Sequence, residues 1–488
     1  MKDEMGLSQI IYNVLKTQIQ FGGYRFGDVL PTMEEASSNF FVALATVRSA
    51  YLRLQKEGYI SLSPNKGSIV IKKYTDGELE ACIQDFFSQR KTALIDLSKS
   101  IRPLLGHAQW LGLRHAPSGI FSDMLLFKDR DELQPYLAFN HITRAYESLG
   151  NELLLRLLWQ IFMFFEAPFF GVPQNSLRIF ALREYAPLTL DYCLRQDWNP
   201  LQKAIWDAQD YFSATLCQFY EDRITAPAPQ QELAFTWHPY EKASQICYSL
   251  AMDLLIPIST GQYAANTLLP SLDKMSKERQ VSVSTVRRAL SLLNGVGATK
   301  SVKRIGTRVL PFEETVENCD FTKPVVRKRL LGLAESLQLL TISCRETATI
   351  TISALDRATL RECKEHLSYL KDSRQYGLVS YTMLDIIRQH APYMAIRTVY
   401  AGLMQQLLWG HPLRVLWRTD EGRRKLHISC CEAFIRSLEE GDAGSFSAKL
   451  EELMLNELEF TVSHLVQLGV SEAQRLLIDG LCIVPKDM

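Results

Sequence analysis

The stretch Val281-Ser-Val-Ser-Thr-Val-Arg-Arg-Ala-Leu290 decides the fold of the chain around it. Ser282 is a good N-cap, because its side-chain oxygen can accept a hydrogen bond from a backbone N–H of the first turn. Apolar side chains then recur at helical spacing and predict one buried face, made of Val286, Leu290 and Leu293. The stretch therefore predicts a capped amphipathic helix.

The opposite side of this helix predicts a basic surface. We expect Thr285, Arg287 and Arg288 to lie off the apolar stripe, with their hydroxyl and guanidinium groups pointing outward. Downstream, Ala298–Val309 indicates two short strands around a tip that contains Lys303, Arg304 and Gly306. A helix with an arginine-rich face, followed by a basic hairpin, can enter a DNA groove and flank it. The segment predicts a winged helix-turn-helix.

The chain contains this pattern twice. Ile19–Thr32 aligns without a gap with Ile258–Ser271, which lies 239 positions later. The same offset superimposes further identical residues, namely Thr46-Val47-Arg48 on Thr285-Val286-Arg287, Ala50 on Ala289, Leu54 on Leu293, Gly58 on Gly297, Gly67 on Gly306 and Val70 on Val309. The identities fall at turn glycines and at helical core positions. We interpret them as a tandem repeat.

Charge is distributed unequally between the two copies. The chain carries 54 Lys and Arg against 54 Asp and Glu, so its net charge is zero. The window 270–309 nevertheless has nine Lys and Arg against two acidic residues, whereas the equivalent window 31–70 has four against three. A local basic patch on a neutral protein is typical of a specific groove reader. The second copy is predicted to be the stronger DNA binder.

Each copy also carries the same ordered set of motifs. The first has Gly22, Gly27, Leu30-Pro31-Thr32, Thr46-Val47-Arg48 and Lys66-Gly67. The second has Gly261, Asn266, Leu269-Pro270-Ser271, Thr285-Val286-Arg287 and Ile305-Gly306-Thr307. Over about residues 7–74 and 246–310, these motifs resemble the DNA-binding domain of GntR-type bacterial transcription regulators. The resemblance implies a first helix, a turn, a recognition helix and a wing in each copy.

The chain departs from this family at two basic positions. Glu34 and Asp273 stand where the family has an arginine after the Leu-Pro-Ser motif, and Leu44 and Val283 replace a second arginine near the recognition-helix cap. The recognition helix of the first copy also has Ala43 in place of a capping serine. Two interpretations of the first copy stay open: it binds DNA weakly, or it has a packing role.

The fold class predicted is mainly α, with two winged helix-turn-helix domains, each followed by a helical-bundle domain. The boundaries are 7–74 and 239–311 for the winged helices, and 75–238 and 312–488 for the helical domains. The segment Thr225–Gln231, rich in Pro and Ala, is interpreted as a linker. The helical domains resemble, weakly, the effector-binding domains of the FadR-like branch of the family, and the second is interpreted as a diverged copy of the first.

That branch commonly holds a divalent metal with an Asp and three His, and the metal binds a carboxylate effector. The first helical domain has His107, His115 and His141, but a complete ligand set cannot be assembled from its sequence. We therefore predict no metal and no cofactor, and interpret these histidines as surface or hydrogen-bonded core residues. Its aromatic residues are interpreted as a core, with an apolar pocket as the alternative: Trp159, Phe162, Phe164, Phe165, Phe169 and Phe170.

Several features indicate a cytoplasmic protein without a membrane span. The amino-terminal residues are polar and charged, and the ten cysteines form no Cys-x-x-Cys pair. The vicinal pair Cys430-Cys431 is interpreted as buried small residues, with redox sensing as the alternative. The apolar stretch Leu153–Val172 is interrupted by Arg156, Glu166 and Pro168, which favours a buried bundle helix.

These observations predict a ligand-responsive, sequence-specific regulator that binds double-stranded DNA. The candidate DNA contacts are Thr32, Thr46, Arg48, Lys66, Gly67, Ser271, Ser282, Ser284, Thr285, Arg287, Arg288, Lys303, Arg304 and Gly306. Ser284, Thr285 and Arg287 would read bases, and Ser271, Arg288, Lys303 and Arg304 would hold phosphates. GntR-type regulators generally act as homodimers, so the tandem could be a monomeric pseudo-dimer or could pair further.

Two other functions are compatible with the sequence. A protein-interaction scaffold could keep the winged-helix shape without binding DNA, and the missing arginines favour it. A small-molecule sensor without a metal is a further option. The sequence has no nucleophile-elbow, zinc-protease, P-loop or dinucleotide motif, so we expect no enzyme.

Overall fold

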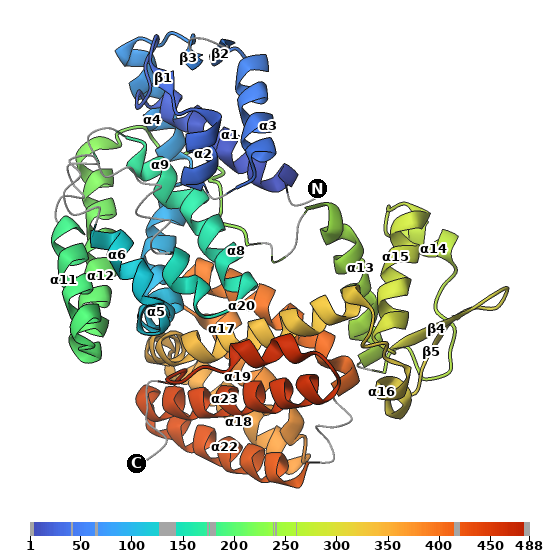
Figure 1. The fold of residues 1–488 in the computed structure, drawn as a ribbon. Helices are drawn as coiled ribbons and strands as arrows, with labels where there is room; N and C mark the ends of the chain where they lie inside the picture. The colour runs from blue at the N-terminus through green and yellow to red at the C-terminus, as the bar shows by residue number, and fades with distance from the viewer. Residues whose placement is uncertain are drawn as a thin grey trace. The chain divides into compact units, whose positions relative to one another are not determined.

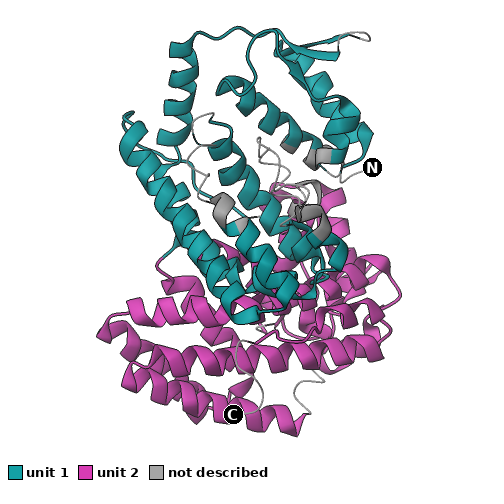
Figure 2. Ribbon diagram, turned by 60° about the vertical axis from the view of Figure 1, so that its left-hand side comes forward, with its two compact units in different colours: residues 1–237, 393–395 teal, residues 238–392, 396–488 magenta. Residues whose placement is uncertain are grey.

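The structure is a computed structural model of the 488-residue chain. It describes residues 4–40, 42–63, 67–125, 143–172, 175, 182–237, 239, 242–259, 261–413 and 420–482. The chain divides into two compact units, residues 1–237 with 393–395 and residues 238–392 with 396–488, which Figure 2 colours separately. Each unit contains one winged helix and one helical domain (Figure 1).

The first winged helix is built from three helices and a three-stranded antiparallel sheet. Its elements are α1 (Glu4–Gln20), β1 (Val29–Leu30), α2 (Met33–Phe40), α3 (Leu44–Lys56), β2 (Ile60–Ser63) and β3 (Gly67–Val70). The strand order is β1-β3-β2. The core forms where one face of α1 meets one face of α3 and the sheet: Ile11, Leu15, Ile19, Val47, Tyr51, Leu54, Ile60 and Val70 are all buried.

The second winged helix repeats this plan. Its elements are α13 (Lys242–Ser259), α14 (Leu272–Glu278), α15 (Val283–Gly295), β4 (Thr299–Val302) and β5 (Gly306–Val309). An isolated bridge between Leu268 and Arg308 replaces the third strand, at the position where Val29 pairs with Ile69 in the first copy. The predicted apolar face of α15 is confirmed, since Val286, Leu290 and Leu293 are all buried.

The two copies share their backbone conformation at equivalent turns. Gly27 and Asn266 both have left-handed backbones, with φ of 91° and 66°. Their N–H groups donate to Val70 and Val309 respectively, each over 2.9 Å. Other matched pairs of glycines also have positive φ: Gly22 with Gly261, Gly58 with Gly297 and Gly67 with Gly306. Asparagine is the residue that most readily replaces glycine in this conformation. The repeat interpretation therefore rests on geometry as well as on identity.

The first helical domain packs around an aromatic core. Its elements are α4 (Asp76–Ser88), α5 (Lys91–His115), α6 (Ser118–Leu125), α8 (Glu152–Ile161), the π-helical turn η1 (Phe162–Glu166), α9 (Ala167–Phe170), α11 (Leu182–Arg195) and α12 (Trp198–Arg223). Phe165 and Phe169 of the central helix are fully buried. Their rings lie 5.0 and 5.7 Å from Phe212 of α12. This cluster has the packing of a core rather than of an open pocket.

The central helix of this domain is apolar enough to resemble a membrane span. Glu152–Phe170 passes a length and hydropathy test for a span, and 56% of the tested window is buried inside the protein. Within the described residues it is the one helix that passes. Its buried face and its aromatic contacts are those expected of a bundle core helix.

The predicted linker has no regular structure, yet it is tied to the first helical domain. Residues 224–237 form neither helix nor strand. The N–H of Leu233 donates to the carbonyl oxygen of Gln89 over 2.7 Å, and the Thr92 N–H donates to the Glu232 carboxylate over 2.8 Å. Phe235 and Trp237 are buried. Residues 232–237, which directly follow the predicted linker, are thus part of the first unit's packing.

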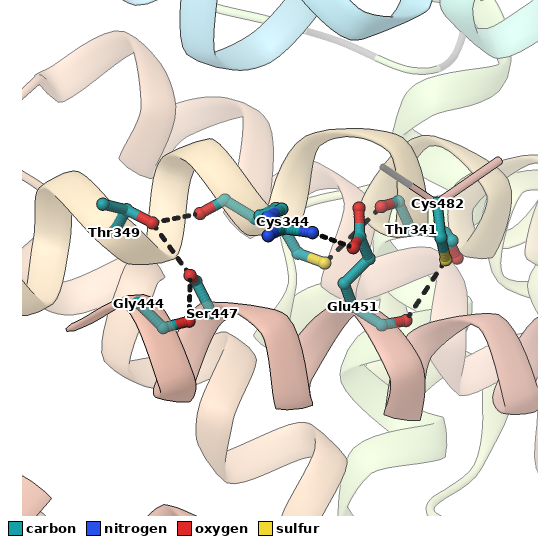
Figure 3. Close-up of polar contacts among 8 residues, drawn as sticks. Thr341, Cys344, Thr349, Gly444, Ser447, Glu451 and Cys482 are labelled. Atoms are coloured by element: carbon teal, nitrogen blue, oxygen red, sulfur yellow. Dashed lines mark hydrogen bonds and ion pairs between the residues drawn. The ribbon is translucent and has the colours of Figure 1, made fainter. Parts of the chain in front are cut away.

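The second helical domain is a bundle around two long helices. Its elements are η3 (Phe312–Glu314), α16 (Thr315–Asn318), α17 (Pro324–Ala354), α18 (Arg357–Asp372), η4 (Tyr376–Leu378), α19 (Val379–His390), α20 (Met394–Leu407), η5 (Leu408–Leu413), α22 (Glu421–Glu440), α23 (Ala443–Gln467) and η6 (Ser471–Leu476). Polar contacts join α17 to α23 (Figure 3). Arg345 forms a 3.0 Å ion pair with the buried Glu451, and Thr349 donates to Ser447 over 2.9 Å.

Most of the cysteines are buried, whereas the histidines range from buried His107 to half-buried His115 and exposed His366. All ten cysteines are free, and Cys430 and Cys431 lie buried on α22. Burial raises the pKa of both thiols, to about 12 for Cys430. His107 is buried with its ring stacked on Trp110, at a centroid distance of 5.2 Å. His141 lies outside the described residues. No group of three or more metal-ligating side chains occurs in the part of the chain that the structure describes.

Candidate nucleic-acid interface

The helix-turn-helix of the second copy is fixed by serine side chains. Ser271 caps α14 by accepting from the Lys274 N–H over 3.3 Å, and Ser282 caps α15 by accepting from the Thr285 N–H over 3.1 Å. Between the two helices, Ser276 donates to the carbonyl oxygen of Val281 over 2.5 Å. Each bond satisfies a backbone group that a helix end or turn leaves open. The recognition helix is therefore held in one orientation.

The outer face of α15 carries exposed cations. Ser284, Arg287 and Arg288 are all exposed, as expected. Neither arginine has a hydrogen-bond or ion-pair partner among the described residues. By contrast, other cations of this domain are paired: Lys274 lies 3.8 Å from Glu278, and Arg279 lies 3.4 Å from Asp253. The unpaired charges are concentrated where a recognition helix would meet DNA.

The wing, formed by strands β4 and β5 in Figure 1, carries a second group of cations. Lys303 and Arg304 are exposed at its tip, where Arg304 has a left-handed backbone with φ of 68° and Gly306 follows with φ of 132°. Lys300 and Arg308 are directly opposite each other on β4 and β5, and both are exposed. Like charges at facing positions of an antiparallel pair are destabilising. An anionic partner would relieve this repulsion.

Lys300 and Arg308 are not among the DNA contacts that the sequence predicts. Their signal was available in the alternation of the hairpin, because Thr307 and Val309 point inward and Arg308 must then point outward. The pairing of Lys300 with Arg308 needed the strand register, which the structure supplies.

Two threonines lie elsewhere than the sequence suggested. Thr285 is half-buried, and its hydroxyl lies 2.8 Å from that of Ser282, so it belongs to the helix cap. Thr46 is only 2% exposed. The reason is that Thr46, Ala50 and Leu54 follow one another at a spacing of four and share the buried face of α3. Thr46 is therefore not among the exposed side chains of the first recognition helix.

The first copy has a weaker cap and a more apolar face. Ala43 makes no side-chain cap to α3, as its sequence implied. Thr32 caps α2 and forms a reciprocal pair with Glu35, over 2.8 and 3.1 Å. Arg48 is exposed and has no ion-pair partner among the described residues, but Leu44 and Leu52 beside it are 44% and 48% exposed. Gly67 begins β3 with φ of 74°, and Lys66 lies outside the described residues.

Other cations of the first copy are engaged within the domain. Arg53 forms a 2.9 Å ion pair with Glu57 and stacks over the Tyr12 ring, 4.0 Å from its centroid. Hydrogen bonds from Tyr12 and Arg53 hold the pKa of the Glu57 carboxyl below its usual value. Arg53 therefore acts in the packing of α3 against α1.

A capped recognition helix beside a two-stranded wing defines a winged helix-turn-helix, and its unpaired cations define a nucleic-acid-binding class. The family model "Bacterial regulatory proteins, gntR family" matches the chain twice, at residues 7–70 and 249–309. These two segments are the two winged helices described above. Both winged helices therefore match the GntR family of DNA-binding domains, and these matches support a DNA-binding transcription regulator.

Solved structures and curated sequences add little to this assignment. A GntR protein of Streptococcus agalactiae is 13% identical, with a TM-score of 0.22, over 44% of this chain and 99% of its own. Lar, which controls the expression of the agr system of Listeria monocytogenes, is 15% identical. Its TM-score is 0.23, over 49% of this chain and 99% of its own. McbR/YncC of E. coli is 16% identical with a TM-score of 0.20, over 44% and 98%. No curated protein sequence matches the chain.

Proposed function

We propose that both winged helices bind duplex DNA and that the tandem acts as a ligand-responsive pseudo-dimer. The observation that carries the proposal is the set of exposed, unpaired cations on α15 and the wing, with Lys300 facing Arg308. In this arrangement Arg287 and Ser284 read base edges, and Arg288, Lys303 and Arg304 contact phosphates. Positively charged side chains supply most of the affinity for phosphates, whereas base-edge contacts supply specificity.

The test is binding of the full chain to the intergenic DNA upstream of its own gene. We expect Arg287→Ala to weaken binding by about 5- to 150-fold, because a bidentate arginine–guanine pair contributes ~1–3 kcal/mol. Lys303→Ala should instead reduce the slope of log affinity against log salt by about one. The matched control is Arg361→Ala, which removes an exposed arginine from α18 in the second helical domain.

Three outcomes distinguish the alternatives. Loss of binding in Arg287→Ala together with weakening in Arg48→Ala supports a two-headed reader. An effect of Arg287→Ala alone assigns the first copy a packing role. If the wild-type chain does not bind the duplex at any salt concentration and neither arginine substitution matters, the scaffold function replaces the proposal.

The pseudo-dimer is proposed because one chain already contains two readers. Sedimentation of the complex with a selected duplex should give one chain per duplex. Two chains per duplex would show that the protein pairs further. The proposal also places the protein in the cytoplasm, and recovery of the chain in a membrane pellet would contradict that.

The ligand response is proposed for the second helical domain, whose interior is polar. Thr347 and Ser343 of α17 bond Tyr400 over 2.6 and 3.2 Å, and the buried Thr461 hydroxyl has no partner among the described residues. This domain touches its winged helix through the buried His411, which lies 3.2 Å from Ser259 of α13. Polar metabolites should therefore change DNA affinity. A panel including small carboxylates that leaves affinity unchanged would argue against it.

A further inference from the structure

The two recognition helices present different chemistry to DNA. Equivalent surface positions, 239 residues apart, are occupied by Ala45 and Ser284, Ser49 and Arg288, and Leu52 and Ser291, and all six side chains are exposed. Among the outward-facing positions compared, Arg48 and Arg287 are the one identical pair. The wings differ in the same direction, because the pair Lys300–Arg308 corresponds to Ser61–Ile69 in the first copy.

These differences lie on the surface, whereas most of the helix core is kept. The buried positions Val47, Ala50 and Leu54 have the equivalents Val286, Ala289 and Leu293, identical and equally buried, and the buried Tyr51 has the apolar equivalent Leu290. Divergence of the outward face over a retained apolar core changes what a helix recognises while leaving it a helix. The two heads therefore have one scaffold and two contact surfaces.

Each surface matches a different set of base-edge groups. In the major groove, arginine pairs best with the O6 and N7 of guanine, and the thymine C5-methyl is the group that apolar side chains contact. Arg48 lies between Leu44 and Leu52 at spacings of four, so the first helix presents one guanidinium flanked by apolar side chains. The second helix presents two guanidinium groups, with the half-buried Val283 at the position of Leu44 and the exposed Ser291 at the position of Leu52.

We infer that the tandem recognises a non-palindromic DNA site with two unlike half-sites. The first winged helix reads a guanine flanked by thymines through Arg48, Leu44 and Leu52. The second reads guanine through Arg287 and makes fewer contacts with thymine methyl groups, because Ser291 stands at the position of Leu52. This inference rests on the proposed function, since it presumes that both heads bind DNA.

The experiment is selection of binding sites from a random 40-base-pair duplex library with the full chain. We expect an enriched sequence with two unlike halves, of which Arg287→Ala loses one and Arg48→Ala the other. Replacing thymine by deoxyuridine in the first half removes only methyl groups. It should weaken binding about fourfold for each contacted methyl, from ~0.8 kcal/mol per buried carbon. The same replacement in the second half should weaken binding less, because only the half-buried Val283 stands in place of the two exposed leucines.

Variants of the first helix complete the test. Leu52→Ser should abolish the sensitivity to deoxyuridine at one position, and Ser49→Arg with Leu52→Ser should shift the first half toward the sequence of the second. The control Leu194→Ser changes a leucine of α11 that is 57% exposed, and should alter neither half. Helical content measured by circular dichroism confirms that each variant is folded.

Three results would overturn the inference, in different ways. Two identical half-sites would show that the surface differences do not affect specificity. A single half-site, insensitive to Arg48→Ala and Leu52→Ser, would assign the apolar face of α3 to a protein partner instead of DNA. No enrichment with the wild-type chain would refute the proposed function itself.

Discussion

Gly297→Ala should destabilise the second winged helix by about 2–5 kcal/mol. Gly297 has φ of 73°, a conformation that costs an L-residue ~1–2 kcal/mol. A Cβ at this position would lie 2.2 Å from the carbonyl oxygen of Thr315 and 3.0 Å from the backbone nitrogen of Cys319. These are backbone atoms of α16 and its end, so relief requires a movement of the chain, and overpacking of this kind costs ~1–3 kcal/mol more.

The first copy supplies the matched control. Gly58 occupies the equivalent position with φ of 77°, and a Cβ there meets nothing within 4 Å. Gly58→Ala should therefore lose only the conformational part, about 1–2 kcal/mol. Calorimetry, with amide hydrogen exchange measured separately over the two wings, compares the variants. Equal losses in the two copies would mean that the approach of α16 does not constrain Gly297.

Glu457→Gln should cost the second helical domain about 3–5 kcal/mol, because it leaves a buried charge without its partner. Glu457 of α23 is 5% exposed and forms an ion pair with Arg423 of α22. Its Oε1 also lies 2.9 Å from His427 Nε2 and accepts from Ser380 over 3.2 Å. The His427 Nδ1 lies 2.8 Å from the Tyr376 carbonyl oxygen, so one carboxylate ties together three helices and a turn.

The same carboxylate predicts a pH dependence. Burial raises the pKa of Glu457, but the His427 hydrogen bond and the Arg423 charge outweigh it, so the pKa lies below the ordinary 4.5. A lowered pKa in the folded state contributes stability above pH 4.5, and this contribution is lost as the pH falls through the folded-state value. The stability difference between wild type and Glu457→Gln should therefore shrink on acidification, as followed by urea denaturation. A constant difference between pH 7 and pH 3 would contradict this.

An exposed ion pair on α22, the helix that carries Arg423 and His427, provides the control. Glu421 lies 3.9 Å from Lys425, and both side chains are more than 75% exposed. Surface pairs of this kind contribute little to stability. Glu421→Gln should change neither the urea midpoint at neutral pH nor the shape of the pH profile.

The winged helices could be predicted because their signals are local. Ser282, the apolar stripe of α15 and the Leu-Pro turn act within a few residues, and the structure places them as expected. The burial of Thr46 was not predictable in the same way, because it depends on which side of α3 packs against the rest of the domain. The left-handed backbone of Asn266, by contrast, can be predicted from the sequence, because Asn266 aligns with Gly27.

The helical domains show where sequence patterns stop being informative. Helix α17 of the second helical domain extends to Ala354. Its later turns carry Thr347 and Thr351, which are buried and bond the carbonyl groups one turn earlier, over 2.9 and 2.6 Å. Apolar periodicity cannot register buried threonines. Likewise, the contacts of Glu457 join residues tens of positions apart, and no local pattern identifies them.

Because both copies lie in one chain, the residues of each contact surface are encoded by their own codons. In a dimer of identical chains, one codon change alters both readers at once, so a substitution that suits one half of a binding site harms the other. Here, a change at Ser49 leaves Arg288 untouched, so under the proposed function each half of the binding site follows its own reader. The copies already differ at this pair of positions, which carries Ser49 in the first copy and Arg288 in the second. If both winged helices bind DNA as proposed, a single mutation retargets one half of the regulator at a time.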